Sequence, residues 1–194
     1  MCILIATDVF GMTPAVDSLV RALGQACVVV SPFDDKHCYF QSEQKAYYAF
    51  LAQGGVSRYA EKVTDALASH GTDITMTIGF SAGASALWIA SEKPAAAQLA
   101  MAILFYGSRI RDHRQVQPRC PVRLIFAEHE AAFNVKELTH ALQNQGHHAQ
   151  LVANMHHGFM NPYSSGFCVK TQNLFLDELK EMARALAVAG ELAN

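Results

Sequence analysis

The sequence has no block of basic residues and carries little net charge. Fifteen lysines and arginines stand against 17 aspartates and glutamates, which gives a formal net charge of −2 at pH 7. Nucleic acids and anionic lipid surfaces are bound through clustered positive charge, and the chain has no such cluster. We therefore exclude nucleic acid and membrane as expected partners and expect a small-molecule substrate.

Paired cysteines and long apolar runs are also absent. The five cysteines are scattered and odd in number, without the C-x-x-C spacing of zinc or redox sites. No apolar run approaches the roughly 20 residues that a membrane-spanning helix needs. The apolar start, residues 1–6, lacks the basic beginning of a secretion signal and runs straight into Thr7 and Asp8. We expect reduced thiols and a cytoplasmic protein.

Histidine is frequent, yet its spacing does not resemble that of a metal site. The nine histidines include the adjacent pairs 147–148 and 156–157. Adjacent histidines rarely point the same way, and no companion ligand follows at helical or zinc-finger spacing. The sequence predicts no metal and no cofactor.

The pattern that is present alternates short apolar runs with helical segments. A length of 194 residues with 51% apolar side chains suits one domain, residues 1–194. The alternation is typical of βαβ units and predicts an α/β fold, a three-layer sandwich with a mostly parallel sheet of about six strands. The strands are expected at residues 3–6, 26–30, 74–78, 101–105, 122–126 and 149–152.

Start and stop signals define several helices. Thr13 as a cap and Pro14 at the first position open a helix that Gly24 closes, and Asn134 with Glu137 opens another. Periodicity predicts further helices at 44–51, 56–67 and about 170–187, the last of them a packing helix.

The segment from 34 to 73 is long for a connection and is a candidate for a partial lid. Its aromatic residues Tyr47, Tyr48 and Phe50 have two interpretations, as the lining of a substrate pocket or as ordinary helix packing.

The strongest local motif is Gly-Phe-Ser-Ala-Gly at residues 79–83. It follows the third expected strand and leads into a run of small residues that suits a helix. This context is that of a nucleophile elbow, in which a tight turn projects the serine from the carboxyl edge of the sheet. Glycines are needed two residues either side because larger side chains would collide there. Ser81 is therefore the candidate nucleophile.

A serine hydroxyl needs a base, normally a histidine oriented by a carboxylate. In α/β-hydrolases the chain order is serine, acid, histidine. Glu128 and Glu130 follow the fifth expected strand, and His156 and His157 follow the sixth. Both the order and the positions fit a triad.

Three further segments resemble the dienelactone hydrolase family of α/β-hydrolases. Asp-Val-Phe-Gly at 8–11 is similar to the family's acidic-apolar-Phe-Gly turn, Phe-Tyr-Gly at 105–107 to its aromatic-Tyr-Gly, and His-Gly-Phe at 157–159 to its His-Gly-Phe. The resemblance implies Ser81 as nucleophile, Glu130 as acid and His157 as base. It also implies an oxyanion hole made by the backbone N–H groups of Val9 and Ala82.

The chain departs from that family in three respects. The name-giving enzymes have cysteine where Ser81 stands, so dienelactone is not transferred as the substrate. The family's acid is usually aspartate, whereas Glu130 is one methylene longer. The chain also begins at what resembles the family's third strand, so we expect a sheet without the usual first two.

Four residues are candidates for substrate binding. Asp8 and Tyr106 lie in the resembling segments, and Arg109 and Arg111 follow a strand at the edge where α/β sheets bind ligands. The alternatives are a helix cap for Asp8 and solvated loop positions for the arginines. The favoured function is a serine hydrolase that cleaves a small carboxylic ester, lactone or thioester. A non-catalytic binding or scaffold protein that retains the fold is the alternative, and a peptidase is disfavoured in so small a chain.

Overall fold

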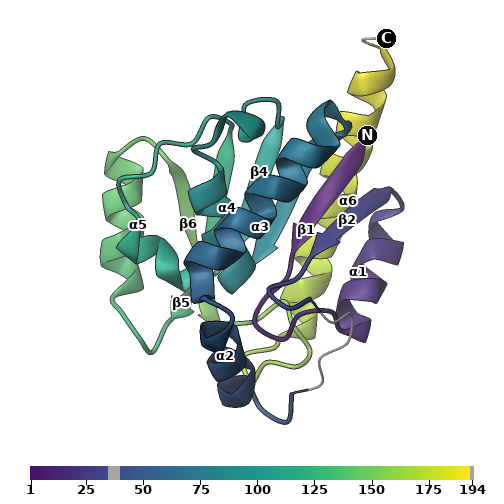
Figure 1. The fold of residues 1–194 in the computed structure, drawn as a ribbon. Helices are drawn as coiled ribbons and strands as arrows, with labels where there is room; N and C mark the ends of the chain where they lie inside the picture. Colours follow the sequence, from purple (N-terminus) through teal and green to yellow (C-terminus); the bar gives the residue numbers. More distant parts are fainter. Residues whose placement is uncertain (35–39, 193–194) are drawn as a thin grey trace.

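The computed structural model describes residues 1–34 and 40–192, which form a sheet of six parallel strands in the order β2-β1-β3-β4-β5-β6 (Figure 1). The expected sheet is confirmed, including its strand number and parallel direction. The strands are β1 (Cys2–Ala6), β2 (Ala26–Val30), β3 (Ile74–Phe80), β4 (Met101–Phe105), β5 (Val122–His129) and β6 (His148–His156).

Helices cover both faces of this sheet. Helices α1 and α6 pack on one face, and α3, α4 and α5 pack on the other (Figure 1). In the described part of the chain, no helix is long and apolar enough to cross a membrane. The helices are α1 (Pro14–Leu23), α2 (Glu43–Ala52), α3 (Gly55–His70), α4 (Ala82–Ala90), α5 (Val135–Asn144) and α6 (Val169–Leu192).

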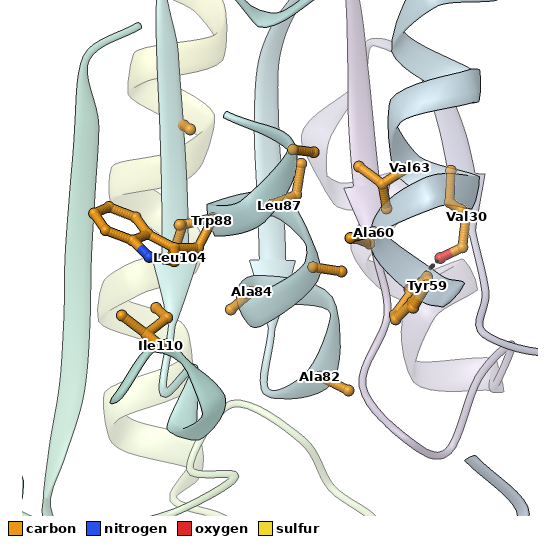
Figure 2. Close-up of a cluster of buried hydrophobic side chains, with 14 of the residues drawn as sticks. Val30, Tyr59, Ala60, Val63, Ala82, Ala84, Leu87, Trp88, Leu104 and Ile110 are labelled. Carbon is orange, nitrogen blue, oxygen red and sulfur yellow. Dashed lines mark hydrogen bonds between the residues drawn. The ribbon is translucent and has the colours of Figure 1, made fainter. Parts of the chain in front are cut away.

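The larger core layer lies between the sheet and helices α3 and α4, where small residues let α4 approach closely (Figure 2). Tyr59 of α3 is 1% exposed, and its hydroxyl donates to the Val30 carbonyl at 2.7 Å. Its oxygen also lies 3.0 Å from the carbonyl oxygen of Thr7. The buried phenol therefore ties the ends of β1 and β2 together, just before the turn that contains Val9.

The lid interpretation of residues 34–73 is wrong for most of that segment. Helix α3 belongs to the core, since Tyr59, Val63 and Leu67 are almost completely buried. The α2 aromatics divide: Phe50 is buried, whereas Tyr47 and Tyr48 are exposed. Residues 35–39 of the expected lid, including Cys38, lie outside the described residues.

Strands β5 and β6 run past their predicted ends, because pairing continues through polar residues that show no apolar pattern. Ala127 pairs with Val152 and His129 with His156, so β6 carries extra residues at this point. Asn154, in this bulge, has a φ of 59°. The extension carries the glutamates and histidines of the predicted triad to the carboxyl edge of the sheet.

The two predicted helix caps behave differently. Asn134 accepts a hydrogen bond from the Glu137 N–H, as expected for a cap. Thr13 occupies the cap position of α1, but its side chain makes no capping hydrogen bond. The hydroxyl of Thr13 is therefore available for other contacts.

Candidate active site

Ser81 stands on a strained turn between β3 and α4. Its φ of 50° and ψ of −108° place a non-glycine residue in a sparsely populated region. The Ser81 N–H donates to the Phe105 carbonyl at 2.9 Å, which ties the turn to β4. Such strain persists only where the surroundings over-determine the backbone, and it concentrates at functional sites.

The glycines of the elbow are required by close backbone approach. A Cβ on Gly83 would lie 2.2 Å from the Ala6 carbonyl oxygen, and one on Gly79 would lie 2.7 Å from the Ala84 Cα. Neither neighbour is a flexible side chain that could move aside. The start of α4, marked by Ala82 in Figure 2, is therefore pressed against the end of β1.

The structure brings Ser81, His157 and Glu130 into one hydrogen-bonded chain. The Ser81 Oγ lies 2.8 Å from His157 Nε2, and His157 Nδ1 lies 2.8 and 3.1 Å from the two carboxylate oxygens of Glu130. The Glu130 side chain is 4% exposed and that of His157 is 26% exposed. The extra methylene of glutamate is accommodated, because its carboxylate reaches the imidazole in hydrogen-bond geometry.

The environment of His157 sets its protonation. Burial lowers the pKa of His157, but the hydrogen bond and the negative charge of Glu130 raise it, and the net shift is upward from 6.5. The more distant carboxylates of Glu43 and Asp8 add to the upward shift. The site is therefore built to stabilise an imidazolium.

The loop after β6 fixes the backbone of His157. Gly158 has a φ of 79°, and a Cβ there would lie 2.1 Å from the Ser164 Oγ. That hydroxyl donates to the His157 carbonyl at 3.3 Å. On the other side the Tyr106 ring meets the imidazole edge to face, with centroids 5.0 Å apart. His157 is thus held from both directions.

The backbone groups expected to form an oxyanion hole lie in adjoining segments. Val9 belongs to the turn after β1, which is closed by the Gly11 N–H donating to the Asp8 carbonyl, and Ala82 is the first residue of α4. Within the described residues, neither the Val9 nor the Ala82 N–H donates to another protein group. Free N–H groups at a helix start favour negative charge.

The neighbouring candidates are directed elsewhere. Glu128 accepts the Asn154 N–H at 2.9 Å and pairs with Lys136 at 3.3 Å. The hydrogen bond from Asn154 and the contact with Lys136 lower the pKa of Glu128. His156 is exposed and packs its ring against His129. Neither residue lies in the hydrogen-bonded chain of Ser81.

A cavity of about 480 Å³ opens on the Glu130 and His157 side and is lined by both predicted arginines. Arg109 contacts Asp112 at 3.0 Å, and Arg111 lies 3.7 Å from the same carboxylate and 4.9 Å from the Phe133 ring centroid. Glu43 and Glu130 line the same space, but among the described residues the two guanidinium groups form ion pairs only with Asp112. We name this space the arginine cavity.

Asp8 does not cap a helix. Its Oδ1 accepts the Phe10 N–H at 2.9 Å, and its Oδ2 accepts a hydrogen bond from the Asn161 side-chain amide. Burial raises the pKa of Asp8 to about 6, although the bonds from Phe10 and Asn161 act in the opposite direction. Asp8 and Tyr106 both line a second cavity, described below.

Among the described residues, no three histidine, cysteine or carboxylate side chains gather as a metal site. The described cysteines, Cys2, Cys27, Cys120 and Cys168, are all free thiols.

Two contributors were missed by sequence reasoning. Ser85 donates its hydroxyl to the Ser81 carbonyl at 3.0 Å and accepts the Arg109 N–H at 3.2 Å, so it links the elbow to the arginine cavity. Its position one helical turn after Ser81 was a usable signal. Asn161 had no such signal, because its partner Asp8 is 153 residues away in the chain.

Comparison with known proteins gives a remote relative and several structural neighbours. No known family profile matches the sequence. YczH, an uncharacterized protein of Bacillus subtilis (strain 168), is 28% identical over 171 residues, covering 85% of this chain and 83% of YczH. That relative carries no stated function.

Solved structures give a clearer match. A Klebsiella pneumoniae protein provisionally named as a dienelactone hydrolase has a TM-score of 0.68 at 14% identity, covering 94% of this chain and 86% of the other. The chain has the α/β-hydrolase fold. A dienelactone hydrolase-like promiscuous phosphotriesterase from metagenomic libraries has a TM-score of 0.66 at 15% identity, covering 95% and 86%. The expected resemblance to dienelactone hydrolases is therefore confirmed at the level of the fold.

Proposed function

We propose that this α/β-hydrolase is a serine hydrolase that cleaves a small carboxylic ester, lactone or thioester. The observation that carries the proposal is the Ser81, His157 and Glu130 chain, with both of its contacts at 2.8 Å. Its neighbours in the comparisons include hydrolases and a carboxylesterase from Bacillus cereus, which has a TM-score of 0.51 at 13% identity, covering 95% of this chain and 87% of the other. These structural similarities support the proposal that the chain is a short member of the dienelactone hydrolase family.

In the proposed reaction the Ser81 hydroxyl attacks the substrate carbonyl carbon while His157 Nε2 takes the hydroxyl proton. Glu130 stabilises the imidazolium that forms. When the tetrahedral intermediate collapses, the bond to the leaving group breaks, and His157 returns the proton to that group. A water molecule, activated by the same imidazole, then releases the acid from Ser81.

The oxyanion of the intermediate has two proposed donors. The N–H groups of Val9 and Ala82 are free of other protein partners in the described residues. A donor of this kind lowers the barrier by about 3 kcal/mol. Preorganisation supports the assignment, because Gly83 packs the start of α4 directly on the end of β1.

We propose that the arginine cavity binds an anionic arm of the substrate. Arg109 and Arg111 share the single carboxylate of Asp112 and, among the described residues, form no ion pair with Glu43 or Glu130 of the same cavity, so guanidinium N–H donors remain for an anionic group. A substrate carboxylate or phosphate would satisfy these guanidinium groups in the fork geometry that arginine favours. The cavity includes His157, which places such a group beside the reacting centre.

The non-catalytic alternative predicts a different outcome for one variant. Ser81→Ala removes the nucleophile while keeping a small side chain in the turn, so the fold should persist by circular dichroism. Turnover of p-nitrophenyl acetate should fall to the uncatalysed background. Unchanged turnover in the variant would remove Ser81 as the nucleophile, and no turnover in the native protein would favour a binding protein that retains the fold.

A further inference from the structure

A second cavity, of about 380 Å³, lies at the carboxyl edge of the sheet between α1 and α6, which run side by side in Figure 1. We name it the α1–α6 cavity. Phe80, which precedes Ser81, lines it, and so does Tyr106, whose ring packs on His157. In the described structure it shares no lining residue with the arginine cavity. His157 and Glu130 line the arginine cavity, whereas the α1–α6 cavity is next to the candidate triad only through Phe80 and Tyr106.

The walls of the α1–α6 cavity are mainly apolar. Leu19 comes from α1, Leu176 from α6, and Phe80 and Met160 from the edge of the sheet and the loop after β6. A space of this size accommodates a single substituted ring, and ligand sites of this kind combine apolar walls with a few placed polar groups.

Its polar groups are the Asp8 carboxylate, several hydroxyls, and the side-chain amides of Asn161 and Gln172, which donate to Asp8 and to the Met160 carbonyl. Each oxygen of Asp8 already accepts one hydrogen bond, from Phe10 or from Asn161, and retains capacity for another. The Thr13 hydroxyl makes no capping bond. Within the described residues the Tyr106 hydroxyl is buried and makes no hydrogen bond of acceptable geometry, although the backbone of Met160 lies close to it. A buried polar atom without a partner calls for an explanation, which a polar ligand atom would supply.

The charge of the residues that line the α1–α6 cavity determines which ligands it can bind. The described residues that line the α1–α6 cavity include no lysine and no arginine, so nothing there balances an added anion. A carboxylate would meet Asp8 in apolar surroundings, where repulsion and lost hydration are both costly. A hydroxyl costs far less to remove from water than a carboxylate does, and it gains a charge-assisted hydrogen bond by donating to Asp8.

We infer that the α1–α6 cavity holds an uncharged, hydroxyl-bearing ring of the substrate, with the hydroxyl donating to Asp8, and that it rejects a carboxylate at the same place. This rests on the proposed function, because the ring is an arm of the ester whose carbonyl reacts at Ser81. The two arms of the substrate then differ in polarity, with the anionic arm in the arginine cavity.

Three small probes test the inference without any turnover. They are 4-ethylphenol, 4-ethylanisole, which lacks the donor, and 4-ethylbenzoate, which carries the negative charge. Binding is measured by calorimetry to the Ser81→Ala protein, so that the result does not depend on catalysis. For the binding that Ala15→Phe abolishes, which is the binding in the α1–α6 cavity, we expect 4-ethylphenol to bind about tenfold more tightly than 4-ethylanisole, and 4-ethylbenzoate to bind most weakly. Any benzoate held in the arginine cavity should still bind after Ala15→Phe.

Two further substitutions test whether the preference for the phenol arises from Asp8 and from the α1–α6 cavity. Adding Asp8→Asn should reduce the advantage of the phenol to less than about threefold and relieve rejection of the benzoate, whereas the control Glu128→Gln should leave both ratios unchanged. Ala15→Phe, which fills the cavity from α1, should abolish phenol binding while thermal unfolding shows a folded protein.

In the part of the binding that Ala15→Phe removes, equal binding of phenol and anisole, preference for the benzoate, or a preference that survives Asp8→Asn would each overturn the inference. Failure of the proposed function is recognised separately, since it would appear as absent Ser81-dependent turnover of p-nitrophenyl acetate whatever the probes do.

Discussion

The elbow that carries Ser81 and the loop that follows Glu130 hold their side chains by different means. At the elbow, backbone packs on backbone: a Cβ on Gly83 would stand 2.2 Å from the Ala6 carbonyl oxygen. After Glu130 the chain is largely exposed, from Ala131 to Asn134. Glu130 itself is placed by its contact with His157 at 2.8 Å. The nucleophile's position is thus fixed by the fold, whereas the acid's position is fixed by a side-chain contact.

This difference bears on one departure from the family that the sequence resembles, the glutamate in place of aspartate. At the elbow the serine that stands in place of cysteine changes one atom of the side chain and leaves the glycines of the turn in place. A loop at the end of extended strands can adjust to a longer carboxylate. Glutamate in place of aspartate is found on the adaptable side of the site.

The largest expected effect is the loss of folding stability in Gly83→Ala. The added methyl group has no room against the carbonyl oxygens of Ala6 and Thr7, so the start of α4 must move away from β1. Gly24→Ala is the control, since Gly24 also has a positive φ but nothing within 4 Å of the new Cβ. We expect the control to lose about 1–2 kcal/mol of unfolding free energy and Gly83→Ala to lose more than about 4 kcal/mol, measured by urea denaturation. Equal losses would break the comparison.

The next effect concerns the histidine that joins the two regions. His157→Ala should reduce kcat for p-nitrophenyl acetate by several orders of magnitude, because among the described residues no other base is hydrogen-bonded to the Ser81 hydroxyl. His156→Ala, one residue away and packed on His129, should retain activity within about twofold. If the His156 variant were the inactive one, the base would be one residue earlier than assigned.

Removing the charge of the acid should lower kcat less than removing the base does. Glu130→Gln keeps the shape but removes the charge that stabilises the imidazolium, so kcat should fall by about 10² to 10⁴. Glu128→Gln should be mild, because that carboxylate contacts Asn154 and Lys136 instead. Steady-state kinetics of both variants would settle which glutamate acts, and two fully active variants would leave the site without an acid here.

The pH dependence of kcat/KM should report the contact between Glu130 and His157. The neutral imidazole is the base, so kcat/KM rises as pH passes through the pKa of His157, which Glu130 holds above 6.5. In Glu130→Gln only burial remains as the main influence, and burial lowers the pKa of the imidazole. The acidic limb should therefore move to lower pH in that variant. An unmoved limb would mean that another group controls it, and Asp8→Asn tests the nearest candidate.

The smallest effect should come from Glu130→Asp, which shortens the side chain without removing its charge. An adaptable loop should keep activity within about tenfold of the native protein. A loss as large as that of Glu130→Gln would show that this loop is as rigid as the elbow.

Local patterns explain what could be predicted from the sequence. Apolar runs placed the strands, and the elbow motif placed Ser81, because a turn between strand and helix depends on neighbouring residues. The core role of α3 was missed, since burial of Tyr59 depends on partners in β1 and β2. The contact of Asp8 with Asn161 was also missed, because only the folded chain brings these residues together.

The most direct test of the central claim is covalent labelling by a fluorophosphonate, which reacts with an activated serine and displaces fluoride. The account predicts one label per native molecule, mapped to Ser81 by peptide mass spectrometry. It also predicts no label after heat denaturation or in Ser81→Ala, and slow labelling in His157→Ala. Labelling elsewhere, or none in the native protein, would contradict it.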